Sequence, residues 1–277
     1  MKEKITANLK VLERKKPLIH MITHQIAAND TANCLLAIGA RPIMAEHPLE
    51  AAEIVTVSAA LGVSLGNINE SRLKAIKTAG ETAFRQNKPH VIDCVGVGVS
   101  RLRLDFAREY IGEFRPAIVK GNASELLALA GCNSHAAGVD AGAEDNLCPP
   151  AAEDKKKSWE IKELQQFAQK NNTIIVVTGE TDLIIDGENT GFVSNGNKML
   201  GKITGSGCML TGIIAAFLGA GAGPLTAAIS GLTLYGAAGE RAAEQAGERH
   251  PGTFRCLLID ALAELAAEGY DPKFYFQ

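Results

Sequence analysis

One glycine-rich turn carries residues suited to holding a phosphate. Gly205, Ser206 and Gly207 precede Cys208, and the helical pattern MLTGIIAAFLG follows directly. Such a turn exposes successive backbone N–H groups at a helix start, where the helix dipole adds positive potential. That environment can stabilise the negative charge of a phosphoryl group during transfer. The alternative is a structural turn beside a buried cysteine, because short glycine motifs alone are weak signals.

A second polar cluster follows the apolar run at 117–119. Lys120 and Asn122 come after this run, and Glu125 stands three residues beyond Asn122. If the run is a parallel strand, these residues lie at its carboxyl end, where ligands of open α/β sheets bind. Glu125 could hold Mg²⁺ there, through water. Asn122 and Glu125 also fit a capping box at the start of a helix, and the two roles are compatible.

Two more polar residues end predicted strands. Asp93 closes the run at 91–93 and is a candidate for a metal or phosphate site; the alternative is a turn-forming aspartate. Thr178 closes the run at 173–178 and is followed by Gly179. A glycine there allows close approach of a nucleotide, because it adds no side chain; the alternative is a tight turn.

Three other patterns resemble known binding motifs, but none of them identifies a binding site. The GVG fragment after Asp93 lacks the third glycine of a dinucleotide-binding loop, since Arg101 occupies that position. Residues 196–202 read GxxxxGK, but Ile203 stands where a P-loop needs serine or threonine. His20 and His24 are spaced as a metal pair on a helix, but no third ligand is evident, so we assign them no metal role.

Composition narrows the class of protein. The 277 residues carry a net charge of −3 and are 46% hydrophobic, which favours a globular protein without a nucleic-acid or anionic-membrane surface. No segment has the apolar length of a signal peptide core or a membrane span, so we expect a cytoplasmic protein. The six cysteines form no CxxC pair, which argues against a zinc site or a disulfide framework.

Short β-rich runs alternate with helical patterns such as 71–86 and 159–170. This alternation predicts an α/β fold whose central, mostly parallel sheet is covered by helices on both faces. Residues 182–186 and 190–194 are expected to form a hairpin at the sheet edge. The last third should be mostly helical, over 206–246 and 253–268 with a break near residues 221–224. Residues 138–158 are expected to form an exposed loop, and no linker divides the single domain, 1–277.

Together and in order, these motifs resemble the hydroxyethylthiazole kinase family over nearly the whole chain. The matching stretches are PLIHMIT (17–23), AN (32–33), LLAIGARPIMAE (35–46), VIDCVGVGVS (91–100), VKGNASE (119–125), GVD (138–140), VVTGETD (176–182) and ITGSGCML (203–210). The resemblance implies a ribokinase-like fold. It also implies ATP- and Mg²⁺-dependent phosphorylation of the primary hydroxyl of 4-methyl-5-(2-hydroxyethyl)thiazole in thiamin salvage. The family is typically a homotrimer, with the thiazole near a subunit boundary.

The resemblance also implies roles on the substrate side. Met44 and Gly205 would contact the thiazole, and Gly205, Ser206 and Gly207 would form the anion hole. Cys208 stands where many members of the superfamily carry an aspartate base, so it would accept the hydroxyl proton or position the hydroxyl. Because Cys208 lies in the first turn of the predicted helix, we expect a lowered thiol pKa.

On the nucleotide side, Lys120 and Thr178 would contact ATP, together with Asn122. Asp93 and Glu125 match the acidic residues that organise Mg²⁺ and the phosphates. The family often has arginine where this chain has Lys120, whose compact charge cannot bind in the bidentate manner of a guanidinium.

The departures from the family pattern lie mainly on the substrate side. The family usually shows HNITN at 20–24, where this chain reads HMITH, and DPVG at 93–96, where it reads DCVG. Arg41 replaces a small residue. The alternatives are therefore a kinase for a related heterocyclic alcohol such as hydroxymethylpyrimidine, a same-fold ATP-dependent dehydratase, and a non-catalytic binding homologue.

Overall fold

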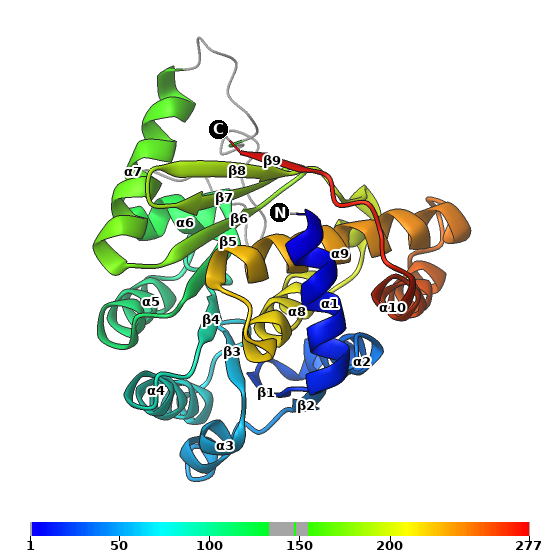
Figure 1. The fold of residues 1–277 in the computed structure, drawn as a ribbon. Coiled ribbons are helices and arrows are strands. Elements are labelled where there is room, and N and C mark those ends of the chain that lie inside the picture. Colours follow the sequence, from blue (N-terminus) through cyan, green and yellow to red (C-terminus); the bar gives the residue numbers. More distant parts are fainter. Residues whose placement is uncertain (1, 133–146, 148–154, 277) are drawn as a thin grey trace.

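The chain is organised around a nine-stranded sheet with the order β2-β1-β3-β4-β5-β6-β7-β8-β9, seen here in a computed structural model (Figure 1). The structure describes residues 2–132, 147 and 155–276. The strands are β1 (Leu18–Ile22), β2 (Arg41–Ile43), β3 (Ala60–Ser64), β4 (His90–Asp93), β5 (Ile118–Asn122), β6 (Ile174–Thr178), β7 (Asp182–Asp186), β8 (Asn189–Val193) and β9 (Phe274–Phe276).

The parallel strands β1 to β6 end at one common edge. The register pairs Ser64 of β3 with Asp93 of β4, and Asp93 with Lys120 of β5. It also pairs Asn122 of β5 with Thr178 of β6. Polar residues that are far apart in the sequence therefore lie side by side at the carboxyl edge, where α/β sheets bind ligands.

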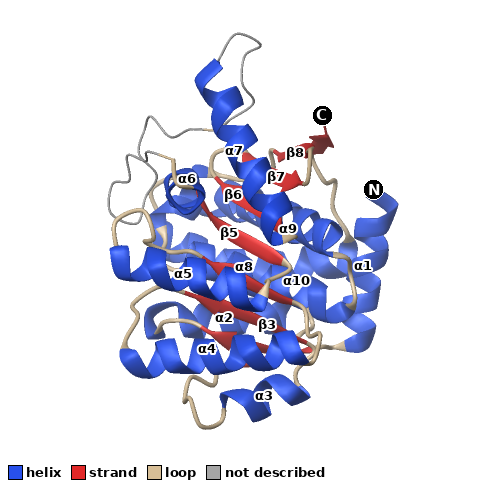
Figure 2. Ribbon diagram, turned by 90° about the vertical axis from the view of Figure 1, so that its left-hand side faces the viewer, coloured by secondary structure: helices blue, strands red, loops and turns tan. Residues whose placement is uncertain are grey.

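Helices cover both faces of the sheet, as the α/β class requires (Figures 1 and 2). One face carries α3 to α7, and the other carries α1, α2 and α8 to α10. Their bounds are α1 (Lys2–Lys15), α2 (Gln25–Ala37), α3 (Ala51–Val57), α4 (Glu70–Arg85), α5 (Arg101–Phe114), α6 (Ala123–Ala130), α7 (Lys155–Asn171), α8 (Ser206–Ala220), α9 (Pro224–Ala246) and α10 (Pro251–Glu268), with a 3-10 helix, η1 (Lys198–Lys202).

Helix α8 is the central helix of the second face. It packs on β1, β3 and β4 and against α2 and α9, and nearly all of its side chains are buried. This explains its apolar sequence on all sides, since a helix without an exposed face needs no polar stripe. Its N-terminus points to the carboxyl edge of the sheet, so the fold brings the glycine-rich turn beside the strand-end residues.

The expected α/β class, the mostly parallel sheet, the hairpin and the helical last third are all confirmed. Several boundaries were wrong. β5 extends to Asn122, so the residues after the run at 117–119 belong to the strand, and α7 begins at Lys155, within the predicted loop. The hairpin does not form the sheet edge, because β9 pairs with β8 outside it. The rest of the predicted loop, with the GVD stretch at 138–140, lies outside the described residues.

Among the described residues, no helix combines the length and apolar character needed to cross a membrane.

Candidate active site at the carboxyl edge of the sheet

A buried ion pair lies at the centre of the carboxyl edge. Lys120 Nζ is 2.9 Å from Asp93 Oδ1, and each side chain is 2% exposed. Thr211 of α8 donates a hydrogen bond of 3.0 Å to the other Asp93 oxygen. Burial alone would lower the pKa of Lys120, but the Asp93 carboxylate outweighs it and holds that pKa above its ordinary value. Lys120 is therefore a cation at neutral pH.

The Glu125 side chain connects the loop after β4 with the end of β5. Its carboxylate accepts hydrogen bonds from the backbone N–H of Gly96, at 2.7 Å, and of Asn122, at 2.8 Å. The Asn122 side chain accepts from Glu125 N at 3.0 Å, so the predicted capping box is confirmed. Burial and the nearby Asp93 carboxylate raise the pKa of Glu125 to about 7.

The glycine-rich turn begins α8, as predicted. Gly205 is the N-cap with φ +78°, a left-handed conformation that favours glycine. A Cβ at Gly205 would lie 2.8 Å from the Cβ of Ala27, so a side chain there also lacks room. A Cβ at Gly207 would lie 3.5 Å from Lys120 Nζ, which shows how closely the helix start approaches the ion pair.

Cys208 lies in the first turn of α8 and is buried. Its sulfur is 3.4 Å from Ser64 Oγ and 3.5 Å from His24 Nε2. The expected lowering of the thiol pKa is wrong. Burial, followed by the Asp93 carboxylate, raises the pKa of Cys208 and outweighs the hydrogen bonds and the Lys120 charge. The thiol is therefore protonated at neutral pH.

These groups share one cavity of about 790 Å³. Nine of the residues singled out in the sequence line it: Asp93, Lys120, Asn122, Glu125, Thr178, Gly205, Ser206, Gly207 and Cys208. Met44 is absent from this lining; its side chain is partly buried against the core beside β2. The fold thus brings together every predicted site residue except Met44.

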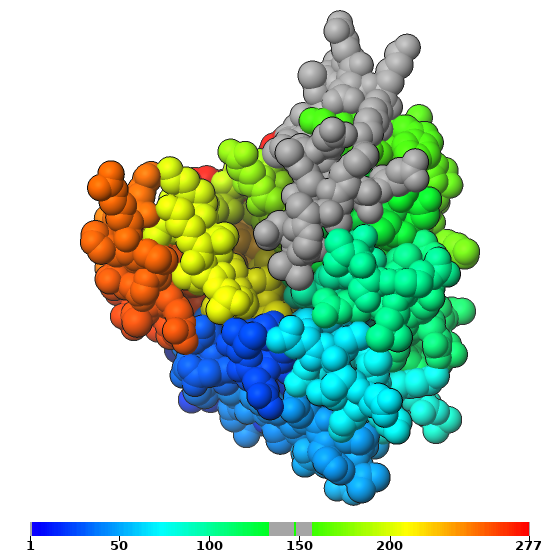
Figure 3. Space-filling model, turned by 180° about the vertical axis from the view of Figure 1, so that it is seen from behind, coloured from blue at the N-terminus to red at the C-terminus, as the bar shows by residue number. Residues whose placement is uncertain are grey.

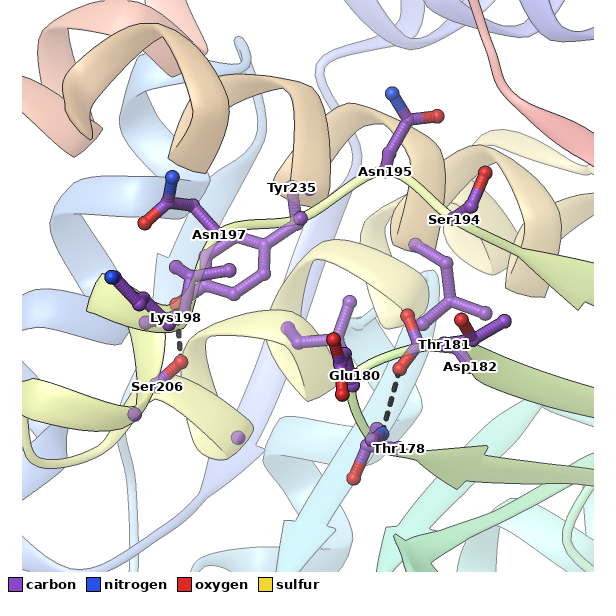
Figure 4. Close-up of a pocket in the computed structure, with 18 residues that line it drawn as sticks. Thr178, Glu180, Thr181, Asp182, Ser194, Asn195, Asn197, Lys198, Ser206 and Tyr235 are labelled. Atoms are coloured by element: carbon purple, nitrogen blue, oxygen red, sulfur yellow. Dashed lines mark hydrogen bonds between the residues drawn. The ribbon is translucent and has the colours of Figure 1, made fainter. Parts of the chain in front are cut away.

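A second cavity of about 890 Å³ adjoins the first, and Thr178, Gly179, Ser206 and Gly207 line both. Figure 4 shows it between the turn after β6, the loop after β8 and α9. In Figure 3 the surface is hollowed beside the yellow segment near residue 200, which contributes to both cavities. Two adjoining cavities around one glycine-rich turn offer room for a nucleotide and for a second small molecule.

The second cavity contains a buried tyrosine that contacts the turn. Tyr235 reaches from α9, and its hydroxyl lies 3.0 Å from Ser206 Oγ (Figure 4). At the other wall, Asp182 accepts a hydrogen bond of 3.0 Å from Gly179 N. Burial raises the pKa of Asp182 to about 7. The Tyr235 hydroxyl thus holds Ser206 in place, although no local motif identifies Tyr235.

Several residues of the first cavity carry no signal in the sequence patterns considered above. Gly66, Asn67 and Arg103 line it, and Ser64 contacts Cys208. Ser64 ends β3, so the rule that located Asp93 would have found it had the run at 60–63 been recognised as a strand. Arg103 lies within α5, where nothing in its neighbours distinguishes it from a surface arginine.

The two N-terminal histidines are not arranged as a helical pair. His20 lies in β1, where its Nε2 contacts the Ala45 carbonyl oxygen at 2.8 Å, and His24 precedes α2. Within the described residues, no group of three or more histidine, cysteine or acidic side chains is placed to hold a metal ion directly.

Comparison with known proteins shows the family of this chain. The model of the hydroxyethylthiazole kinase family matches residues 9–268. Hydroxyethylthiazole kinase 2 from Clostridium botulinum is 44% identical over 252 residues, which cover 91% of this chain and 92% of the relative. The hydroxyethylthiazole kinase protein from Pyrococcus horikoshii superposes with a TM-score of 0.84 at 32% identity, and 99% of each chain is covered. A ribokinase-like superfamily protein from Enterococcus faecalis, with a TM-score of 0.61 and 13% identity, shares the fold over 92% of this chain and 94% of its own. The chain has the ribokinase-like fold and belongs to the hydroxyethylthiazole kinase family.

Proposed function

We propose that this protein transfers the γ-phosphoryl group of ATP to the primary hydroxyl of 4-methyl-5-(2-hydroxyethyl)thiazole in thiamin salvage. The observation that carries the proposal is the glycine-rich turn at 205–207, which begins α8 close to Lys120 and lines the same cavity as Lys120 and Cys208. Phosphoryl transfer depends on positioning and on charge stabilisation more than on covalent chemistry, and these groups supply both.

Within this proposal, the site residues divide into a group that contacts ATP and a group that contacts the alcohol. Lys120, Asn122 and Thr178 contact ATP, and Thr178 is well placed for this because it lines both cavities. The N–H groups of residues 205–208 stabilise the transferring phosphoryl group. Cys208 accepts or positions the hydroxyl of the thiazole alcohol, whose ring contacts Gly205 and Met44.

The acidic residues fit a magnesium ion held through water. Both oxygens of Asp93 and both of Glu125 already accept hydrogen bonds from the protein or pair with Lys120. Both carboxylates still line the cavity, so their remaining lone pairs can hold the waters that Mg²⁺ usually retains. When bound, the ion would neutralise charge on the ATP phosphates.

A homotrimer would explain the position of Met44. Met44 does not line the first cavity of its own chain. Three exposed apolar side chains lie in α2 or in the segment after β2, which also contains Met44. Ile26 and Leu36 of α2 and Leu49 after β2 are 57%, 58% and 84% exposed. We propose that a neighbouring copy covers them and supplies Met44 to the thiazole. Sedimentation analysis tests this: Leu49→Glu should dissociate the assembly.

We also propose that residues 1–277 form a single domain and that the protein is cytoplasmic. One sheet connects the described elements, and β9 of the C-terminal segment pairs with β8. A single cooperative unfolding transition, observed identically by fluorescence and circular dichroism, would support one domain, and two separated transitions would contradict it.

The test of the function is ADP release from the purified protein with ATP and Mg²⁺, with and without the thiazole alcohol, and identification of the product by mass. ADP release that requires the alcohol, with a phosphorylated thiazole as product, is the expected result. Turnover with hydroxymethylpyrimidine instead would identify an altered substrate, ADP formed with hydrated nicotinamide nucleotide would identify the dehydratase, and ligand binding without ADP would identify a binding protein.

A further inference from the structure

A histidine lies directly against the thiol of the candidate active site. His24 Nε2 is 3.5 Å from Cys208 Sγ, although the two residues are 184 positions apart. The imidazole is 9% exposed and lines the same cavity as the thiol. Its other nitrogen, Nδ1, is buried and has no hydrogen-bond partner among the described residues. Among the described residues, Cys208 Sγ is therefore the one hydrogen-bonding contact that the ring makes.

The position of this ring is set by the surrounding backbone. The His24 carbonyl oxygen accepts hydrogen bonds from the N–H groups of Ala27 and Ala28 at the start of α2, both at 3.0 Å. The ring packs on Gly66, where an added Cβ would lie 2.4 Å from His24 Cδ2. The glycine at position 66 thus leaves room for the imidazole beside Cys208.

The charges around the pair keep the imidazole neutral. Burial lowers the pKa of His24, and Arg72 of α4 and Arg103 of α5 lower it further, while Asp93 of β4 opposes them. Burial and Asp93 raise the pKa of Cys208. A protonated thiol cannot take up a second proton unless it passes its own proton on. A neutral imidazole in contact with the sulfur is the group that can receive it.

We propose that His24 receives the thiol proton of Cys208 while Cys208 receives the proton of the substrate hydroxyl, an inference that rests on the proposed kinase function. As the hydroxyl oxygen bonds to the γ-phosphorus, the bond from that phosphorus to the β,γ-bridging oxygen breaks. The electron pair of the broken bond leaves with ADP. The hydroxyl proton moves to Sγ, the thiol proton moves to Nε2, and the imidazolium releases its proton to solvent after the products leave. His24 is thus a positioning residue that acts through Cys208.

The kinetic test compares His24→Asn with His250→Asn, an exposed histidine at the start of α10. Asparagine is a favoured N-cap residue, so the first variant should fold. We expect kcat at pH 7 to fall about 100-fold in His24→Asn, with a much smaller change in KM for the alcohol. Wild-type kcat should decrease at acid pH as His24 protonates. In His24→Asn, kcat should instead rise toward alkaline pH as Cys208 ionises, and His250→Asn should behave as wild type.

Alkylation of Cys208 by iodoacetamide tests the pair without any substrate. Followed by peptide mass spectrometry between pH 6 and 9, the rate at pH 7 should be about tenfold lower in His24→Asn, with its profile moved to higher pH. Exposed Cys256 provides an internal control in the same samples. Identical Cys208 profiles in wild type and variant would overturn the inference, as would an unchanged kcat profile.

The two readouts also separate the two proposals. If wild-type protein releases no ADP with the thiazole alcohol, the proposed function fails, and the alkylation profiles alone decide whether His24 takes the thiol proton. If turnover is normal and both His24→Asn readouts match wild type, the function stands and the role of His24 is overturned.

Discussion

Lysines lie at both edges of the parallel sheet, but they bind different partners: backbone carbonyl groups at the amino edge and a carboxylate at the carboxyl edge. At the amino edge, Lys88 donates to the carbonyl oxygens of Thr56 and Ser58 at the end of α3. Lys15 likewise donates to Ala220 O at the end of α8. A cation at a helix C-terminus satisfies free carbonyl groups and interacts favourably with the helix dipole. The amino edge therefore uses charge to hold helix ends.

At the carboxyl edge, Lys120 has the Asp93 carboxylate as its partner and lines a cavity. Strand β4 connects the two edges, since it begins with buried His90 and ends with buried Asp93. Lys15 and Lys88 also line a cavity, of about 350 Å³, so the difference lies in the partners. A lysine bound to backbone carbonyl groups stabilises the fold, whereas an ion pair of two side chains beside a cavity can also meet a ligand. Variants at the amino edge should cost stability, and variants at the carboxyl edge should cost activity as well.

Asp93→Asn should have the largest effect. It leaves the Lys120 ammonium buried without its counter-charge, which should lower the free energy of unfolding by about 3 to 5 kcal/mol and abolish turnover. Urea unfolding and ADP release measure the two losses. Lys88→Met at the amino edge is the control and should cost about 1 kcal/mol with full turnover. Equal unfolding midpoints for Asp93→Asn and wild type would contradict the contrast between the edges.

Cys208→Ser should lower kcat by about 100-fold and leave the affinity for ATP unchanged, because in the proposed function the thiol acts on the hydroxyl of the alcohol and does not contact ATP. Steady-state kinetics and calorimetric titration with ATP measure the two quantities. Exposed Cys256→Ser serves as the control. Full turnover in Cys208→Ser would rule out a role for the thiol as proton acceptor.

Two glycines of the same turn should respond differently to alanine. Gly205→Ala should cost about 1 to 3 kcal/mol of stability, because φ is +78° and Ala27 leaves no room for a Cβ. Gly207→Ala meets only ordinary contacts and should keep its stability, while its methyl group near Lys120 hinders the phosphoryl group and lowers turnover. Thermal unfolding and ADP release of both variants make the comparison, and equal stability losses would refute it.

His90 should produce a pH-dependent loss of stability without a role in catalysis. Burial lowers its pKa from 6.5 to about 4 in the folded protein. The unfolded chain therefore binds more protons between these values, and stability falls as the pH falls below 6.5. The expected loss between pH 6.5 and 5.5 is on the order of 1 kcal/mol. Urea unfolding at both pH values should show a smaller loss in His90→Gln, and an identical slope would contradict the assignment.

The gathering of polar residues at the carboxyl edge was predictable from the chain. Asp93 and Thr178 end apolar runs, Lys120 follows one, and parallel strands end at one edge, so these side chains had to lie near one another. The capping box of Asn122 and Glu125 was equally readable, because it depends on residues three positions apart. Their roles toward ATP and Mg²⁺ remain predictions.

The first three strands were harder to predict. β1 contains buried His20, β2 has three residues with Pro42 at its centre, and β3 contains Gly62. Each departs from the apolar, β-branched pattern of a buried strand. They form strands because they pair with neighbouring strands of the sheet. This pairing is between residues far apart in the chain, so a short stretch of sequence does not reveal it.

Cys208 shows which properties follow from local sequence and which follow from packing. Its position was predictable, and the protonation state of its thiol was not. Glycines at 205 and 207 and the apolar run after them were sufficient to place a helix start with its thiol in the first turn, because backbone conformation follows local residue types. The protonation of that thiol was beyond local sequence. The helix dipole favours a thiolate, but burial by distant elements and the Asp93 carboxylate raise the pKa. The contact with His24 likewise exists only because α2 and α8 pack together. Desolvation and long-range contacts depend on every element around a group, so the tertiary structure alone decided them.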